Sequence, residues 1–128
     1  MILLEGINDI GNNAGPNGTP LTAQDLIDGY RNLIAQAHAA GVRIIGATML
    51  PDYGNGYYSV SAESIRQAAN NWIRTSGAFD GVIDFDKVMQ DPANSVALNP
   101  SFDSGDHLHP NAAGMQAMAN AIDLQLIS

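Results

Sequence analysis

Short apolar runs alternate with longer amphipathic stretches along this chain, and this order constrains its fold more than any other feature. The apolar runs have the length and residue types of buried β-strands and cover Met1–Ile7, Val42–Leu50 and Gly81–Phe85. The stretches with apolar residues at helical spacing cover Thr22–Gly41, Ser61–Gly77 and Asn111–Leu126. A β-α-β-α-β-α order predicts parallel strands with right-handed crossovers and helices on both faces of the sheet.

Local signals mark the ends of the predicted helices. Thr22, followed by Asp25, is typical of a helix N-terminus, and Gly41 is a typical stop. Ser61 is the expected cap of the second helix, and Asn111 is expected to begin the last one. Between the third strand and the last helix, the sequence predicts a weak helical turn and then an irregular stretch rich in Pro, Asn and Ser.

One face of the last predicted helix is apolar. It consists of Met115, Met118, Ala119, Ile122 and Leu126. Methionines at spacings of three and four are typical of core packing rather than of a cofactor site. We therefore expect this face to be buried.

Composition narrows the class of protein. The chain has 128 residues, 5 Lys and Arg against 13 Asp and Glu, and a formal net charge of −8, which disfavours nucleic acid as a partner. This length predicts a single domain over residues 1–128. The absence of cysteine excludes disulfides, zinc thiolate sites and thiol nucleophiles. Met1–Leu4 is too short for a signal peptide or a membrane span, so we expect a soluble protein of undetermined localisation.

The segment from residue 104 to residue 111 concentrates the side chains best suited to chemistry. In one interpretation, Asp106 accepts a hydrogen bond from Nδ1 of His109, three residues later, and Nε2 is left free to act as a general base. Pro110 would stiffen the turn directly after His109. This interpretation predicts a general-base pair in a tight turn.

Three other interpretations fit the same segment. His107 and His109 could bind a metal ion with Asp103 or Asp106, because alternating histidines can share one side of an extended loop. The N-terminus of the following helix could bind an anion, although its acidic surroundings oppose this. The side chains could also only cap the helix and close a turn. The segment by itself does not decide among these alternatives.

A second candidate lies at the end of the first predicted strand. There the side-chain amide of Asn8 could donate a hydrogen bond to a developing oxyanion, or it could close an Asx turn. Asp9 is better explained as a residue that holds the loop through backbone N–H groups. Because ligands bind beyond the carboxyl ends of parallel strands, we expect Asn8 and His109 to meet in one crevice.

Together, the Gly-Ile-Asn-Asp of residues 6–9 and the Asp106, His109 and Pro110 group resemble the conserved blocks of the SGNH hydrolases, also called the GDSL esterase/lipase family. The resemblance spans essentially the whole chain. It implies an α/β fold with a three-layer, flavodoxin-like parallel sheet. It also implies an ester hydrolase in which His109 is base and acid, Asp106 orients it and Asn8 belongs to the oxyanion hole. No cofactor and no metal are implied.

The sequence departs from that family at the nucleophile. It contains no Gly-Asp-Ser, the block that carries the family serine, and neither Ser101 nor Ser104 stands at a strand-to-helix turn. The resemblance therefore implies a truncated domain over residues 1–128, with three strands recognised and the first two family strands missing. It implies a carboxylester hydrolase with weak or no activity by itself; the alternative is a catalytically silent binding or assembly module with the same fold.

The resemblance also suggests substrates and partners. Short-chain acyl esters or acetylated sugars are the implied substrates, and secretion is compatible with the family. Tyr53, Tyr57 and Tyr58 could line the substrate site, although ordinary loop packing explains them equally well. With the neighbouring family strand missing, Ile2–Ile7 would be an unblunted apolar sheet edge, so we expect a homodimer through this strand.

Overall fold

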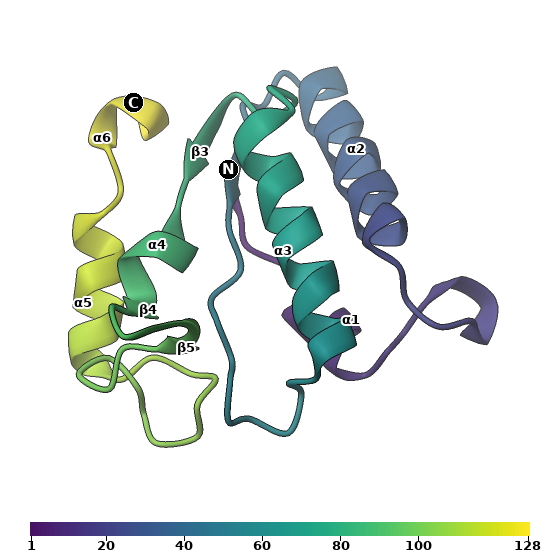
Figure 1. The fold of residues 1–128 in the computed structure, drawn as a ribbon. Coiled ribbons are helices and arrows are strands. Elements are labelled where there is room, and N and C mark those ends of the chain that lie inside the picture. Colours follow the sequence, from purple (N-terminus) through teal and green to yellow (C-terminus); the bar gives the residue numbers. More distant parts are fainter.

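A parallel sheet forms the centre of the molecule (Figure 1). The computed structural model describes all residues 1–128. The strands are β1 (Ile2–Leu3), β2 (Ile45–Ala47) and β3 (Gly81–Ile83), in the spatial order β1-β2-β3. Both strand pairs are parallel. The predicted α/β fold with a parallel sheet is confirmed.

Helices cover both faces of this sheet, with α2 and α3 on one side and α5 and α6 on the other (Figure 1). The long helices are α2 (Ala23–Ala39), α3 (Val60–Thr75) and α5 (Ala112–Asn120). The short elements are α1 (Ile7–Gly11), the 3-10 turn η1 (Pro16–Gly18), α4 (Phe85–Met89), β4 (Gln90–Asp91), β5 (Asn94–Leu98) and α6 (Leu124–Ile127). No helix is both long enough and apolar enough to cross a membrane.

Two separate groups of buried side chains hold these layers together. Consecutive residues of a strand point to opposite faces, so Ile44 packs with the α2 and α3 side while Ile45 packs with the α5 side. On the first side, Tyr30, Trp72 and Phe79 pack with ring centroids 6.1–6.2 Å apart. Both faces of the central strand β2 are thus buried, as its apolar sequence requires.

The strands are shorter than predicted. β1 ends at Leu3, and Ile7, which was predicted to be in the strand, begins α1. β1 pairs with β2 at two positions, Ile2 with Ile45 and Leu3 with Gly46, and Gly6 at φ 123° then leads the chain into α1. At the other edge, Asp84 ends β3 by capping α4, where its side chain accepts a hydrogen bond from the backbone N–H of Lys87. Pairing and capping, rather than hydrophobicity alone, set these boundaries.

Two of the three predicted helix starts agree with the structure, and one differs. Thr22 and Asp25 form the capping box of α2, and Asn111 caps α5, as predicted. The cap of α3 is Ser59 and not Ser61, because the Ser59 hydroxyl accepts from the N–H of Ala62 and starts the helix two residues earlier than predicted.

The region after β3 contains three further corrections. The stretch predicted to be irregular includes the antiparallel hairpin β4-β5, whose mostly polar strands carry no clear hydrophobic alternation. The last helix is interrupted after Asn120, because Asp123 caps a separate helix α6. Met115, predicted to be buried, is 56% exposed, since no element of the chain covers that end of α5.

Candidate active site

The loop between β5 and α5 holds the Asp106–His109 pair. Nδ1 of His109 lies 2.5 Å from Oδ2 of Asp106. The other carboxylate oxygen, Oδ1, accepts hydrogen bonds from the backbone N–H groups of Leu108 (2.9 Å) and His109 (2.8 Å). The Ser104 hydroxyl donates to the same oxygen at 3.1 Å. A spacing of three residues in a tight turn thus gives the carboxylate four donors from its own loop.

These donors keep the Asp106 carboxyl ionised. The backbone N–H of His109, followed by its ring and the N–H of Leu108, holds the pKa of Asp106 far below its ordinary value of 3.8. An ionised carboxylate can only accept hydrogen bonds, so Nδ1 of His109 carries the proton and Nε2 is left to accept one. The His109 side chain is 70% exposed and within reach of a ligand.

A second histidine–aspartate pair braces the same loop. Nδ1 of His107 lies 2.6 Å from Oδ2 of Asp103, and Oδ1 of Asp103 accepts from the N–H groups of Gly105 and His107. His107 adopts φ 62°, in the left-handed region. The two histidines therefore face different aspartates, and the structure contains no group of three or more His, Asp or Glu side chains placed to hold a metal ion.

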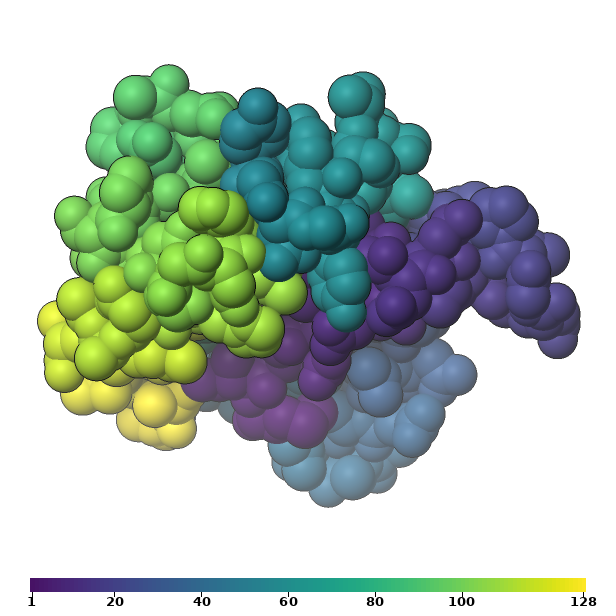
Figure 2. Space-filling view, turned by 90° about the horizontal axis from the view of Figure 1, so that it is seen from below, coloured from purple at the N-terminus to yellow at the C-terminus, as the bar shows by residue number.

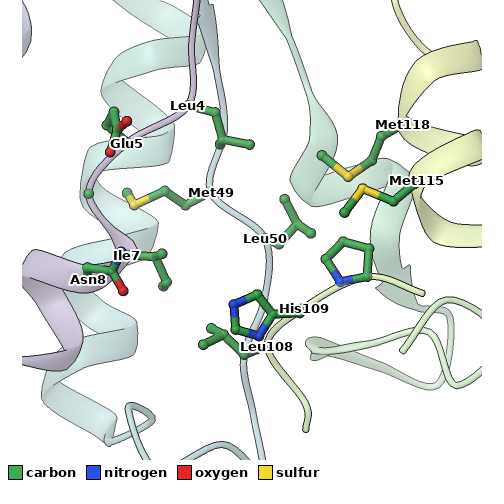
Figure 3. Close-up of a pocket in the computed structure, with 12 residues that line it drawn as sticks. Leu4, Glu5, Ile7, Asn8, Met49, Leu50, Leu108, His109, Met115 and Met118 are labelled. Carbon is green, nitrogen blue, oxygen red and sulfur yellow. The ribbon is translucent and has the colours of Figure 1, made fainter. Parts of the chain in front are cut away.

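Asn8 and His109 line one groove, although they lie about a hundred residues apart in sequence (Figure 3). The groove has a volume of about 470 Å³. Its N-terminal side carries Leu4 and Asn8, and its opposite side carries His109 and Met115 (Figure 3). Asn8 is the second residue of α1 and not the end of the strand. Its assignment to the oxyanion hole stays a prediction.

The serines and tyrosines named from the sequence lie outside this groove. The Ser104 hydroxyl bonds to Asp106 rather than to Nε2 of His109, and no hydrogen bond joins Ser101 to His109. Tyr53 and Tyr58 pack edge to face, with ring centroids 4.9 Å apart. A role for the tyrosines in substrate binding stays a prediction.

Two further residues support the site; Asp103 was considered above only as a metal ligand, and Asn55 was not selected from the sequence. Asp103 holds His107, as described above, and Asn55 donates from Nδ2 to the backbone oxygen of Asp106 at 2.8 Å. The Asn55-Gly56 dipeptide is a recognisable turn signal, but nothing in the local sequence indicates which distant loop this turn touches.

Comparison with known proteins finds a matching family model and similar solved structures. The model of the GDSL-like lipase/acylhydrolase family matches residues 1–117. No curated protein matches the chain. A solved GDSL-like lipase from Bacteroides thetaiotaomicron is similar, with 19% identity and a TM-score of 0.79 over 98% of this chain and 60% of that one. So is a candidate acylhydrolase from Bacteroides fragilis, with 20% identity and a TM-score of 0.75 over the same shares. The chain thus spans about 60% of the length of each structure, and at these identities the likeness concerns the fold alone.

Proposed function

The chain belongs to the GDSL-like lipase/acylhydrolase family, and from this premise we propose that Asp106, His109 and Asn8 serve in the hydrolysis of carboxylic esters. The observation that carries the proposal is the short Nδ1–Oδ2 hydrogen bond of the Asp106–His109 pair beside a groove that Asn8 also lines. A histidine held in one tautomer by an ionised carboxylate is suited to proton transfer at its other nitrogen.

The proposed reaction is acyl transfer in two halves. Nε2 of His109 removes the proton of a hydroxyl nucleophile as its oxygen attacks the ester carbonyl carbon. The side-chain amide of Asn8 donates to the resulting oxyanion. His109 then gives its proton to the departing alcohol oxygen as the carbon–oxygen bond breaks, and water releases the acid by the same steps. Asp106 stays ionised throughout.

The nucleophile limits what these 128 residues do by themselves. No serine hydroxyl is hydrogen-bonded to Nε2 of His109. Since loss of a triad nucleophile costs on the order of a millionfold in turnover, we expect slow hydrolysis by residues 1–128 alone. Short-chain acyl esters or acetylated sugars are the proposed substrates, with Tyr53, Tyr57 and Tyr58 as the proposed substrate loop.

Hydrolysis of p-nitrophenyl acetate by the wild type, His109→Ala and Asp106→Asn tests the function. Both variants should lose the protein-dependent rate. His38→Ala is the matched control, because His38 pairs with Asp80 and lies outside the groove. Equal rates for wild type and His109→Ala would refute the role of His109. Serine-directed phosphonates should not label the chain, and stoichiometric labelling of Ser104 would identify a different nucleophile.

A second candidate function follows because no serine hydroxyl is hydrogen-bonded to Nε2 of His109. A catalytically silent module with this fold would bind esters or sugars in the groove without turnover. Calorimetric binding of a ligand that the wild type fails to hydrolyse, with affinity unchanged in Asp106→Asn, would favour this alternative over the enzyme.

The first strand is the proposed dimer interface. β1 pairs with β2 alone, and Ile2 and Leu4 are 38% and 37% exposed. Two copies of this edge, related by a two-fold axis, would satisfy each other's unpaired backbone groups. Light scattering should give the dimer mass at micromolar concentration, and Leu4→Lys should give the monomer. Val60→Lys, on the exposed side of α3, is the control; a monomeric wild type would refute the interface.

A further inference from the structure

The segment after β2, residues 52–58, lies between the two parts of the proposed site. In the space-filling view, the lime-green residues of the loop that carries His109 lie beside the dark-teal residues that follow β2 (Figure 2). We infer that Asn55 is a positioning residue for the Asp106–His109 pair and that this segment fixes the pair relative to Asn8. This inference rests on the proposed function, because it assigns a role within that same site.

Asn55 is held at both ends of its side chain. Nδ2 donates to the backbone oxygen of Asp106 at 2.8 Å, and Oδ1 accepts from the backbone N–H of Tyr57 at 2.9 Å. The backbone of Asn55 is held as well, since its N–H donates to the Asp52 oxygen and its own oxygen accepts from Tyr58. A side chain fixed in this way transmits the position of its turn to the peptide group of Asp106.

A second contact joins the same two segments one residue away. A Cβ on Gly54 would lie 3.0 Å from Cδ2 of His107, and Gly54 adopts φ +97°. Any other residue would strain the backbone and press on the His107 ring. Glycine thus permits the close approach that brings Asn55 within hydrogen-bonding distance of Asp106.

The opposite side of the segment packs on the helix that carries Asn8. A Cβ on Gly11, in α1, would lie 2.1 Å from Cγ of Tyr57, so the tyrosine ring rests directly on the helix backbone. No hydrogen bond joins the Asn8 side chain to His109. The distance between Asn8 and His109 is therefore set by the segments that lie between them. Residues 52–58 contact both α1, which carries Asn8, and the loop that carries His109. Proton transfer and oxyanion stabilisation require such placement to within a fraction of an ångström.

Asn55→Ala tests the positioning role by NMR on the 128-residue protein. Without the bond from Nδ2, the Asp106 turn should loosen. The hydrogen-bonded Nδ1 proton of His109 should then broaden or move upfield, and the pKa of the Asp106 carboxyl should rise toward its ordinary value of 3.8. Asn99→Ala is the control, because Asn99 also bonds a nearby backbone N–H in a turn but touches neither member of the pair. Equal changes in both variants, or none in Asn55→Ala, would overturn the inference.

Tyr57→Ala tests the contact of the segment with α1 separately from its contact with the Asp106 loop. It should leave the Asp106 titration unchanged, because Asn55 keeps its bond to Asp106, yet reduce His109-dependent ester hydrolysis roughly 10- to 100-fold through displacement of α1. A hydrolysis rate equal to that of the wild type would refute the claim that the segment positions Asn8 through Tyr57. The NMR readouts do not depend on turnover, so a protein without His109-dependent hydrolysis would refute the proposed function and still report on Asn55.

Discussion

At the scale of single residues, His107 carries backbone strain beside the proposed base. A side chain with a Cβ at φ 62° costs about 1 kcal/mol relative to glycine. We therefore expect His107→Gly to unfold with a free energy about 1 kcal/mol higher than His107→Ala in urea. Both variants lose the bond to Asp103, so their difference isolates the backbone.

The same pair of substitutions at a helical position serves as the control. Asn71 lies on the exposed side of α3, so the unfolding free energy of Asn71→Ala should be about 1 kcal/mol higher than that of Asn71→Gly. If the glycine variant were less stable than the alanine variant at both positions, backbone strain at His107 would be contradicted.

Asp52 is a second residue whose environment predicts a measurable effect. Its side chain is buried, and Oδ2 has no hydrogen-bond partner. Burial raises the pKa of Asp52 above 3.8; the charge of Arg66 opposes this shift and that of Glu63 adds to it. A raised folded-state pKa contributes stability that is complete below the unfolded value and is lost as the pH rises through the folded one.

Asp52→Asn should therefore gain stability relative to the wild type as the pH rises from about 4 to about 8, because asparagine never ionises. Urea unfolding of both proteins at the two pH values measures the change. A difference in unfolding free energy that is the same at both values would contradict it.

At the scale of elements, α3 is tied to the β3–α4 junction by buried charge. The Arg66 side chain is 0% exposed and donates to Glu63, to Asp86 and to the backbone oxygen of Met49. Arg74, two turns further along α3, donates to Asp84 and Asp86. These bonds fix the helix against the ends of β2 and β3, and the segment 52–58 follows β2.

Arg66→Met should lower the unfolding free energy by about 3–5 kcal/mol, because it leaves Glu63 and Asp86 without their buried cation. Arg43→Met is the matched control, since the exposed side chain of Arg43 makes one long hydrogen bond, to Ser128, and its loss should change stability by less than about 1 kcal/mol. Similar losses in the two variants on urea unfolding would show that the buried network contributes little.

At the scale of the whole molecule, stability depends on ionised aspartates. The carboxyls whose pKa lies below 3.8 belong to Asp25, Asp80, Asp84, Asp103 and Asp106. For Asp80 the main cause of the low pKa is the backbone N–H of Ile44. A lowered folded-state pKa contributes stability above the unfolded value, and this stability is lost as the pH falls through the folded value.

The urea midpoint of the protein should therefore fall steadily below about pH 4. Asp80→Asn should have a lower midpoint than the wild type at pH 7 and approach it near pH 2, where the Asp80 contribution is being lost. Circular dichroism during urea titration measures both midpoints. A wild-type midpoint that stays constant from pH 6 to pH 2.5 would contradict this account.

The sequence by itself determined the features that depend on neighbours along the chain. Alternating apolar runs and amphipathic stretches identified the parallel α/β fold, and Thr22 with Asp25 identified the start of α2. The hydrogen bond between Asp106 and His109 also follows from their spacing. In both hydrogen-bonded pairs, the donor and acceptor lie three residues apart, so their meeting costs little chain entropy and the spacing can be recognised in the sequence.

Only the tertiary structure decided the features whose partners are distant in sequence. β1 ends at Leu3, where its pairing with β2 stops, and Met115 is exposed because no element covers it. Asn55 meets Asp106 because the fold brings together two loops that lie 51 residues apart in sequence. Such contacts depend on the packing of whole layers. Packing tolerates many residue types at each contact, so the spacing of residues along the chain does not predict them.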